Sequence, residues 1–286
     1  MHDRHTEIDS ASETKITIGA EIRCAPGTVL SDAEWQEVLQ LLDIASAPES
    51  LRQYAVARSD SVSRRREFAG LPTLKRILRR SDVRDVFLSI EGASAAVPSS
   101  HYSNWVEGAL CFAHASGASE LQSINWRRYV PDNEGDWLAV RAAIQSLFTL
   151  CRGVCGQMHS AREISYVRNE TSSLCSWPWK PRFPDEDTEA RVMQLKPYRA
   201  ANDPRVFGAY WGTFLNAEQV EALGGVRQVL ATAPVAHTEV LDGGAMYLQL
   251  TDTPGPITTP GMRAALPLLE AYLAPISVPV RYFTAP

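Results

Sequence analysis

The sequence contains none of the short motifs that identify common catalytic sites. Neither G-x-x-x-x-G-K-[ST] nor G-x-G-x-x-G occurs, so no glycine-rich loop is indicated that would hold a phosphate. G-x-S-x-G and H-E-x-x-H are also absent, and with them the signs of a hydrolase nucleophile elbow and of a protease zinc site. We therefore expect a protein that is not an enzyme.

Long apolar runs are missing as well. No segment has the roughly 18 uninterrupted apolar residues of a membrane span. The opening stretch MHDRHTEIDSASETK is polar and lacks the apolar centre of a secretory signal, so we expect a cytoplasmic protein without a membrane partner. The formal net charge of -5 argues against a general nucleic-acid-binding protein.

Cysteine is scarce, and its pattern favours reduced thiols. The chain has five cysteines, an odd number that does not fit the dense framework of a small disulfide-linked domain. Cys151, Cys155 and His159 would share one face if a single helix carried all three. Gly153 and Gly156 indicate that the helix ends there, and no second Cys/His pair completes a tetrahedral zinc site. We expect neither a metal nor another cofactor.

The last third of the chain has the clearest secondary-structure pattern. Residues 205–215, RVFGAYWGTFL, alternate as expected of a strand that is buried on both faces. Asn216 with Gln219 predicts a capped helix, and Gly224 and Gly225 predict where that helix stops.

A hairpin and a second helix follow. Residues 233–241 and 245–251 alternate on either side of Asp242-Gly243-Gly244, which predicts two antiparallel strands. A helix is expected from Thr259 and Pro260, although Pro267 conflicts with a helix interior and could instead mark the first turn. With a last strand in VPVRYF, residues 278–283, the order is β-α-β-β-α-β, a ferredoxin-like unit.

The first half shows similar patterns less clearly. KITIGAEIR, residues 15–23, alternates as a strand, and Ser31 with Glu34 forms a capping box before a helix with one apolar face. The further elements expected are a helix around Leu74, Ile77 and Leu78, strands within residues 83–90, 104–115 and 123–130, a helix from Asp136 to about Cys151, and a closing strand in ISYV, residues 164–167.

These patterns predict an α+β fold made of two packed ferredoxin-like halves with mainly antiparallel sheets. The expected organisation is a polar tail (residues 1–14), an N-terminal α+β half (15–170), a connection rich in proline and charge with one short helix (171–204), and a C-terminal half (205–286).

The connection carries aromatic and charged residues that suit either of two roles. They are Trp177, Trp179, Lys180, Arg182, Asp185, Glu186 and Asp187. The tryptophans would anchor the connection on a domain surface, while the acidic residues would complement the dipole of a helix that begins near Thr188. Alternatively the segment is an exposed recognition element, because aromatics and arginine are enriched at interface hot spots.

Two further groups contain residue types that are typical of functional sites. His237 and Glu239 lie two residues apart on one strand face, which would suit an acid/base pair or a purely structural role. Between Arg58 and Asp85 there are nine Lys/Arg and four Asp/Glu, a local basic patch. A solvated helix face explains the patch most simply, and without interleaved aromatics we expect no nucleic-acid partner.

The C-terminal third also resembles a known family, the bacterial type VI immunity proteins, and more loosely the immunity proteins of polymorphic toxin systems. The resemblance lies in a strand ending in Trp-x-Thr, a helix closed by Leu-Gly-Gly, and a late helix with an aromatic before Leu-x-Pro-Ile. These positions are Trp211, Gly212, Thr213, Leu223, Gly224, Gly225, Tyr272, Leu273, Pro275 and Ile276. The chain departs from the family at Thr251–Thr258, TDTPGPIT, where a Gly-Asp-like segment is usual.

The resemblance implies a non-enzymatic protein that binds and neutralises a cognate secreted toxin and so protects the producing cell. The partner would be a toxin domain, with the connection around Trp177–Asp187 and the loop containing Asp252 as candidate contacts. The competing hypothesis is an enzyme or small-molecule binder on a ferredoxin-like scaffold, which hosts many unrelated functions.

Overall fold

The fold is built on one ten-stranded sheet in which every neighbouring pair of strands is antiparallel. The structure is a computed structural model that describes residues 15–46, 51–58, 61, 63–64, 66–90, 108–115, 118–131, 134–160, 205–206, 208–254 and 259–277. The strand order is β3-β2-β4-β5-β6-β1-β7-β8-β10-β9.

The elements follow one another along the chain as follows. The strands are β1 (Lys15–Cys24), β2 (Leu51–Ala57), β3 (Arg66–Glu67), β4 (Asp85–Ile90), β5 (Gly108–Ala115), β6 (Ala118–Pro131), β7 (Gly153–Ser160), β8 (Gly212–Leu215), β9 (His237–Val240) and β10 (Met246–Gln249). The helices are α1 (Asp32–Ser46), α2 (Leu71–Leu78), α3 (Glu134–Leu150), α6 (Ala217–Ala222), α7 (Val226–Thr232) and α8 (Pro260–Leu273), with short 3-10 turns η2 (Asp242–Gly244) and η3 (Ala274–Ile276).

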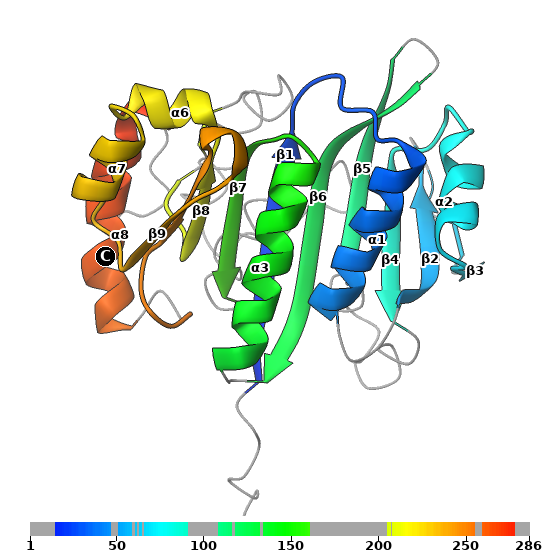
Figure 1. Ribbon diagram of the computed structural model, residues 1–286. Helices are drawn as coiled ribbons and strands as arrows, with labels where there is room; N and C mark the ends of the chain where they lie inside the picture. Colours follow the sequence, from blue (N-terminus) through cyan, green and yellow to red (C-terminus); the bar gives the residue numbers. More distant parts are fainter. Residues whose placement is uncertain are drawn as a thin grey trace, which may run out of the picture.

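Strand β1 lies inside the sheet, between β6 and β7. The predicted strand is confirmed, and Ile18, Ala20 and Ile22 of its predicted inner face are all buried, although Gly19 and Arg23 of the other face are buried as well. Helices α1 and α3 pack against each other and cover the same face of the sheet (Figure 1). The apolar side chains of β1 therefore supply much of the burial that holds this face together.

Local signals for the helices are confirmed where they lie within a few residues of one another. Ser31 and Glu34 form the predicted capping box: the Ser31 backbone N–H donates to Glu34 Oε2 at 2.7 Å, and the Glu34 N–H donates to Ser31 Oγ at 3.3 Å. Asn216 and Gln219 form a second box with bonds of 2.9 and 2.8 Å. Each box satisfies backbone donors that the first helical turn would otherwise leave unpaired.

Two glycines after α3 have a different role from the one predicted. Gly153 and Gly156 do follow the end of the helix, but both belong to strand β7. A Cβ atom on Gly153 would lie 2.3 Å from the Phe148 ring, and one on Gly156 would lie 3.2 Å from Phe214. The glycines make room for these two rings, which stack with centroids 5.1 Å apart.

Strand β7 also joins the two regions of the chain that were expected to form separate halves. It pairs with β8 in the register Cys155 to Leu215 and Met158 to Gly212. The α+β class and the antiparallel sheet are confirmed, whereas the two ferredoxin-like halves are not, because strands of both regions belong to one continuous sheet.

The C-terminal region corrects three expectations. Residues 205–215 are not one strand: Gly208 has a φ of 118°, β8 begins only at Gly212, and Val206 instead forms an isolated bridge to Ser277. A second short helix, α7, follows Gly225 where none was predicted. Pro267 lies inside α8, which begins at Pro260, so it does not mark the first turn.

The predicted hairpin is confirmed, with β9 and β10 antiparallel around the η2 turn. Strand β2 was missed in the sequence. The strands proposed in residues 164–167 and 278–283, the tail 1–14 and the connection 171–204 lie outside the described residues. Within the part of the chain that is described, no helix is both long and apolar enough to cross a membrane.

Candidate functional sites

A polar cluster lies where α3 meets the last two strands of the sheet. We call it the α3–β10 cluster, and its members are Arg141 and Gln145 of α3, His237 and Glu239 of β9, and Tyr247 and Gln249 of β10. Arg141 and Gln145 are one helical turn apart and so share a face. The strand register sets Tyr247 opposite Glu239 and Gln249 opposite His237, which places all four strand residues on one face.

Hydrogen bonds connect the helix to both strands. Arg141 Nη1 donates to Gln249 Oε1 at 2.9 Å, and Gln145 Nε2 donates to Glu239 Oε2 at 2.9 Å. The Tyr247 hydroxyl donates to the same Gln249 oxygen at 3.4 Å. The cluster therefore ties a helix from the first half of the chain to a hairpin from its last third.

Tyr247 is the most deeply buried member of the cluster. Burial raises the pKa of Tyr247 well above its usual value; the Arg141 guanidinium acts in the opposite direction and Glu239 in the same one. The guanidinium carbon of Arg141 lies 5.8 Å from the centre of the Tyr247 ring, within range of a cation–π contact. The phenol keeps its proton at neutral pH and acts here as a hydrogen-bond donor.

His237 and Glu239 lie on one face of their strand, as predicted. His237 Nε2 is 3.7 Å from Glu239 Oε2, and the two side chains are 45% and 42% exposed. The same Glu239 oxygen accepts the hydrogen bond from Gln145, which fixes the carboxylate in place. The pair is positioned to exchange a proton with a molecule at this surface, or to bind a charged group of a partner.

The loop after β10 begins at this cluster. Gln249 Nε2 donates to the backbone oxygens of Thr251 and Asp252 at 3.0 and 3.2 Å. The indole N–H of Trp211 donates to the same Thr251 oxygen at 2.9 Å. These bonds fix the backbone at Asp252, whose side chain is exposed as a recognition residue requires. Residues 255–258 of this loop are not described.

The other predicted contact residues are not placed by the structure. Trp177, Trp179, Arg182, Asp185, Glu186 and Asp187 all lie outside the described residues. Their assignment as partner contacts stays a prediction.

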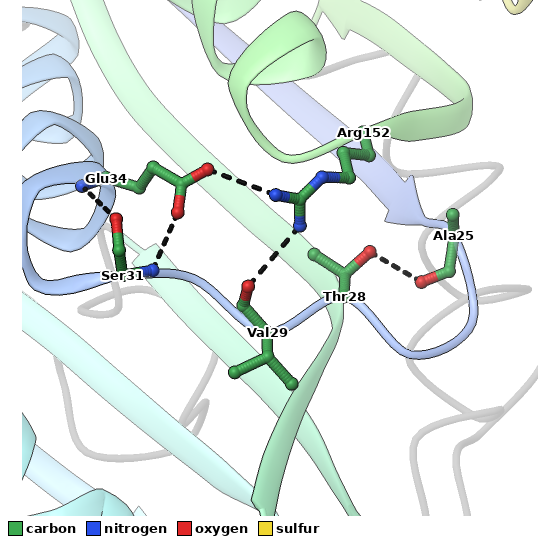
Figure 2. A network of polar contacts seen from close by, with 6 residues as sticks. All are labelled: Ala25, Thr28, Val29, Ser31, Glu34 and Arg152. Carbon is green, nitrogen blue, oxygen red and sulfur yellow. Dashed lines mark hydrogen bonds and ion pairs between the residues drawn. The ribbon is translucent and has the colours of Figure 1, made fainter.

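A second polar network lies just beyond the C-terminal end of α3 (Figure 2). Arg152 has a φ of 51°, the left-handed conformation, and its guanidinium reaches Glu34 Oε1 at 3.2 Å and the Val29 backbone oxygen at 3.4 Å. Hydrogen bonds from the Ser31 backbone and side chain, aided by Arg152, lower the pKa of Glu34. The network joins the turn between α3 and β7 to the start of α1.

The proposed helical set of Cys151, Cys155 and His159 is not formed. Cys151 follows the end of α3, whereas Cys155 and His159 lie on β7. A hydrogen bond with the Cys151 thiol and burial both raise the pKa of Cys24, so this thiol stays protonated. Among the described residues, no group of three or more His, Cys, Asp or Glu side chains could hold a metal ion.

The basic patch is centred on α2 and carries several ion pairs. Lys75 Nζ lies 2.6 Å from Asp32 Oδ2, while Arg58 and Arg80 both contact Asp82, at 2.8 and 3.0 Å. Leu74 and Ile77 point into the core as predicted, and Arg76 and Arg79 are exposed. The prediction of a charged, solvent-facing helix surface is confirmed here.

Four members of the α3–β10 cluster were not identified in the sequence. Arg141 and Gln145 carry a signal that could have been used, because they are polar residues at i and i+4 next to an apolar helix face. Tyr247 and Gln249 alternate in the same way as His237 and Glu239. Which helix would cover this strand face could not be deduced from local patterns.

The fold belongs to the class of α+β proteins with a single large antiparallel sheet. No family model matches the chain, and no curated protein matches it. Among solved structures, the chain is similar to the Pseudomonas aeruginosa T6SS protein PA0821, with a TM-score of 0.61 and 12% sequence identity. The alignment covers 92% of this chain and 73% of that chain. At this identity the likeness shows a shared fold.

Proposed function

We propose that this protein is an immunity protein of a type VI or related contact-dependent toxin system. In this role it binds a cognate toxin domain and neutralises it, which protects the cell that produces both. The observation that carries the proposal is the likeness to a T6SS protein across 92% of the chain. Because the match extends over nearly the whole length of this chain, the likeness concerns the arrangement of most of its elements and not one common motif.

The residues of the family resemblance have clear structural roles, which supports the same proposal. Trp211 and Thr213 are fully buried at the start of β8, and Leu273 is fully buried at the end of α8. Gly224 and Gly225 have positive φ values of 99° and 86°, which an L side chain rarely adopts. These residues determine how the C-terminal region packs. They therefore indicate a shared fold, while the surface of this protein that would bind a toxin is free to vary.

Neutralisation by binding requires a rigid surface and no chemistry of the protein's own. The backbone at Asp252 is rigid because Gln249 and Trp211 hold it through hydrogen bonds, while the carboxylate is exposed. An exposed carboxylate on a fixed backbone suits a basic group of a toxin. The protein would work in the compartment where its toxin acts, for which we propose the cytoplasm.

The first test looks for a toxin domain encoded by a neighbouring gene and compares the growth of cells that express it with and without this protein. We expect growth to be restored and a stable complex to be isolated by co-purification. Toxicity that persists when both proteins are present at equal levels would reject the immunity function. A complex without restored growth would leave a toxin-binding protein that does not neutralise.

The contact at Asp252 can be tested in the same complex. Asp252→Lys should weaken toxin binding about tenfold or more, because a charge reversal replaces an attraction by a repulsion. Glu37→Lys, an exposed position on α1, is the matched control and should leave the affinity unchanged. If both variants bound the toxin with the affinity of the unmodified protein, Asp252 would be excluded from the interface.

The second candidate function is a small-molecule binder or enzyme, favoured by the fixed His237–Glu239 pair. A double substitution His237→Ala and Glu239→Ala would abolish ligand binding or turnover in that case. An immunity protein that does not use this face would protect cells equally well with both substitutions in place.

A further inference from the structure

Helix α2 lies at the end of the sheet opposite the C-terminal helices (Figure 1). Residues on its outer side line a shallow groove. The groove has a volume of about 410 Å³ and is lined by Leu71, Pro72, Lys75, Arg76 and Arg79. Two apolar side chains at the start of the helix are thus followed by three cations over the next two turns. This combination can accept a chain that is itself both apolar and acidic.

The cations of the groove exceed the carboxylates available to them. Lys75 is paired with Asp32, and the nearby Asp82 is already shared by Arg58 and Arg80. Arg76 and Arg79 are exposed, and neither makes an ion pair or hydrogen bond through its side chain within the described part of the chain. The groove therefore presents two uncompensated guanidinium groups.

The helix that carries these groups is firmly held. Thr73, Leu74 and Ile77 on its inner side are buried, and the Thr73 hydroxyl accepts a hydrogen bond from the Ala69 backbone at 3.2 Å. Arg76 and Arg79 are three residues apart, so their attachment points are roughly 5–6 Å apart on one face. Two arginines attached to a well-held helix at this spacing can pair with two carboxylates one helical turn apart.

We propose that the α2 groove docks an acidic segment of a partner protein. Two carboxylates of the segment pair with Arg76 and Arg79, and an apolar side chain next to them packs on Leu71 and Pro72. The apolar lining favours a peptide over nucleic acid, because the groove offers no aromatic side chain on which a base could stack. This surface does not depend on the immunity function proposed above.

The test uses the full-length protein and a fluorescein-labelled helical peptide with glutamates at i and i+3 flanking leucine, followed by fluorescence anisotropy. A peptide with glutamine in place of glutamate and a single-stranded oligothymidylate of equal charge serve as the comparison probes. We expect the glutamate peptide to bind in preference to both. Added salt should weaken its binding, since the contacts are exposed ion pairs.

Substitutions locate the contact. Arg76→Glu with Arg79→Glu should weaken binding of the glutamate peptide by about tenfold or more. Arg227→Glu with Arg263→Glu makes the same change in net charge on exposed residues at the other end of the sheet and should have little effect. Arg76→Lys with Arg79→Lys should retain part of the binding, and thermal melts check that every variant is folded.

Three results would overturn the proposal. The first is that the glutamate peptide does not bind the unmodified protein. The second is that both charge-reversed variants lose peptide binding equally. The third is that oligothymidylate binds at least as strongly as the peptide. Failure of the growth test for immunity would leave these measurements unaffected, so the two proposals can fail separately.

Discussion

Helix α3 is anchored at two places that differ in burial. Along its length, Arg141 and Gln145 reach the β9–β10 hairpin, where Tyr247 and Gln249 are buried. Beyond its C-terminal end, Arg152 reaches Glu34 at the surface, with side-chain exposures of 51% and 28%. One anchor joins distant regions of the chain and includes the buried Tyr247 and Gln249, whereas the other fixes a turn through groups that water also contacts.

Because the anchors differ in burial, the number of contacts in each does not tell which one contributes more to stability. A hydrogen bond from a charged donor to a buried acceptor contributes about 1.5–3 kcal/mol, because the acceptor cannot turn to water when the donor is lost. An exposed ion pair contributes about 0–1 kcal/mol, since water and salt compete with it. We therefore expect the α3–β10 cluster to contribute more to stability than the Arg152 network.

The same substitution at both anchors tests this ranking and has the largest expected effect. Arg141→Met should lower the free energy of unfolding by about 2–3 kcal/mol, through loss of the Gln249 bond and of the contact with the Tyr247 ring. Arg152→Met should lower it by about 0.5 kcal/mol. Urea unfolding measures both, and equal losses would contradict the distinction between a buried and an exposed anchor.

A smaller expected effect distinguishes the contribution of the Arg152 backbone conformation to stability from that of its side chain. Its φ of 51° costs any residue with a Cβ atom about 1 kcal/mol. Arg152→Gly should therefore be more stable than Arg152→Ala by about 1 kcal/mol, although both lose the contacts with Glu34 and Val29. Arg79 is the control, because it caps α2 with a φ of -70°, and glycine there should be no better than alanine. Thermal unfolding measures all four variants. The same difference between glycine and alanine at Arg152 and at Arg79 would contradict a role for the left-handed conformation of Arg152.

The smallest expected effect is on acid stability. The pKa of Glu34 is lowered in the folded protein, so its contribution is full above its unfolded pKa of about 4.3 and is lost as the pH falls through the folded value. Glu34→Gln should make stability less dependent on pH below about 4.5, measured by urea unfolding across that range. Glu37→Gln removes an exposed carboxylate from the same helix, and an identical change with this control would exclude a specific role for Glu34.

The sequence predicted those parts of the fold whose determinants are close together in the chain. Both capping boxes, Ser31 with Glu34 and Asn216 with Gln219, need only residues three apart. Strand β7 was missed because Gly153 and Gly156 look like a helix stop. The rings that require these glycines, Phe148 and Phe214, meet only in the folded protein.

The candidate site likewise has one part that local patterns could predict and one part that they could not. The shared face of His237 and Glu239 follows from the two-residue period of a strand, so it could be predicted. That Arg141 and Gln145 would meet this face depends on how β7 and β8 bring two regions of the chain into one sheet. Long-range pairing of that kind leaves no trace in a local pattern.

The position of β1 inside the sheet has a consequence for how the protein folds. Ile18 pairs with Arg128 on one side and with Ser160 on the other, so this strand leaves the ribosome well before either neighbour has been made. Closing loops of that length is slow, whereas the β5–β6 and β9–β10 hairpins need only nearby residues. We expect β1 to remain unpaired, with its apolar face exposed, until the β5–β6 hairpin offers it the edge of β6. During this interval the nascent chain would be most in need of a chaperone.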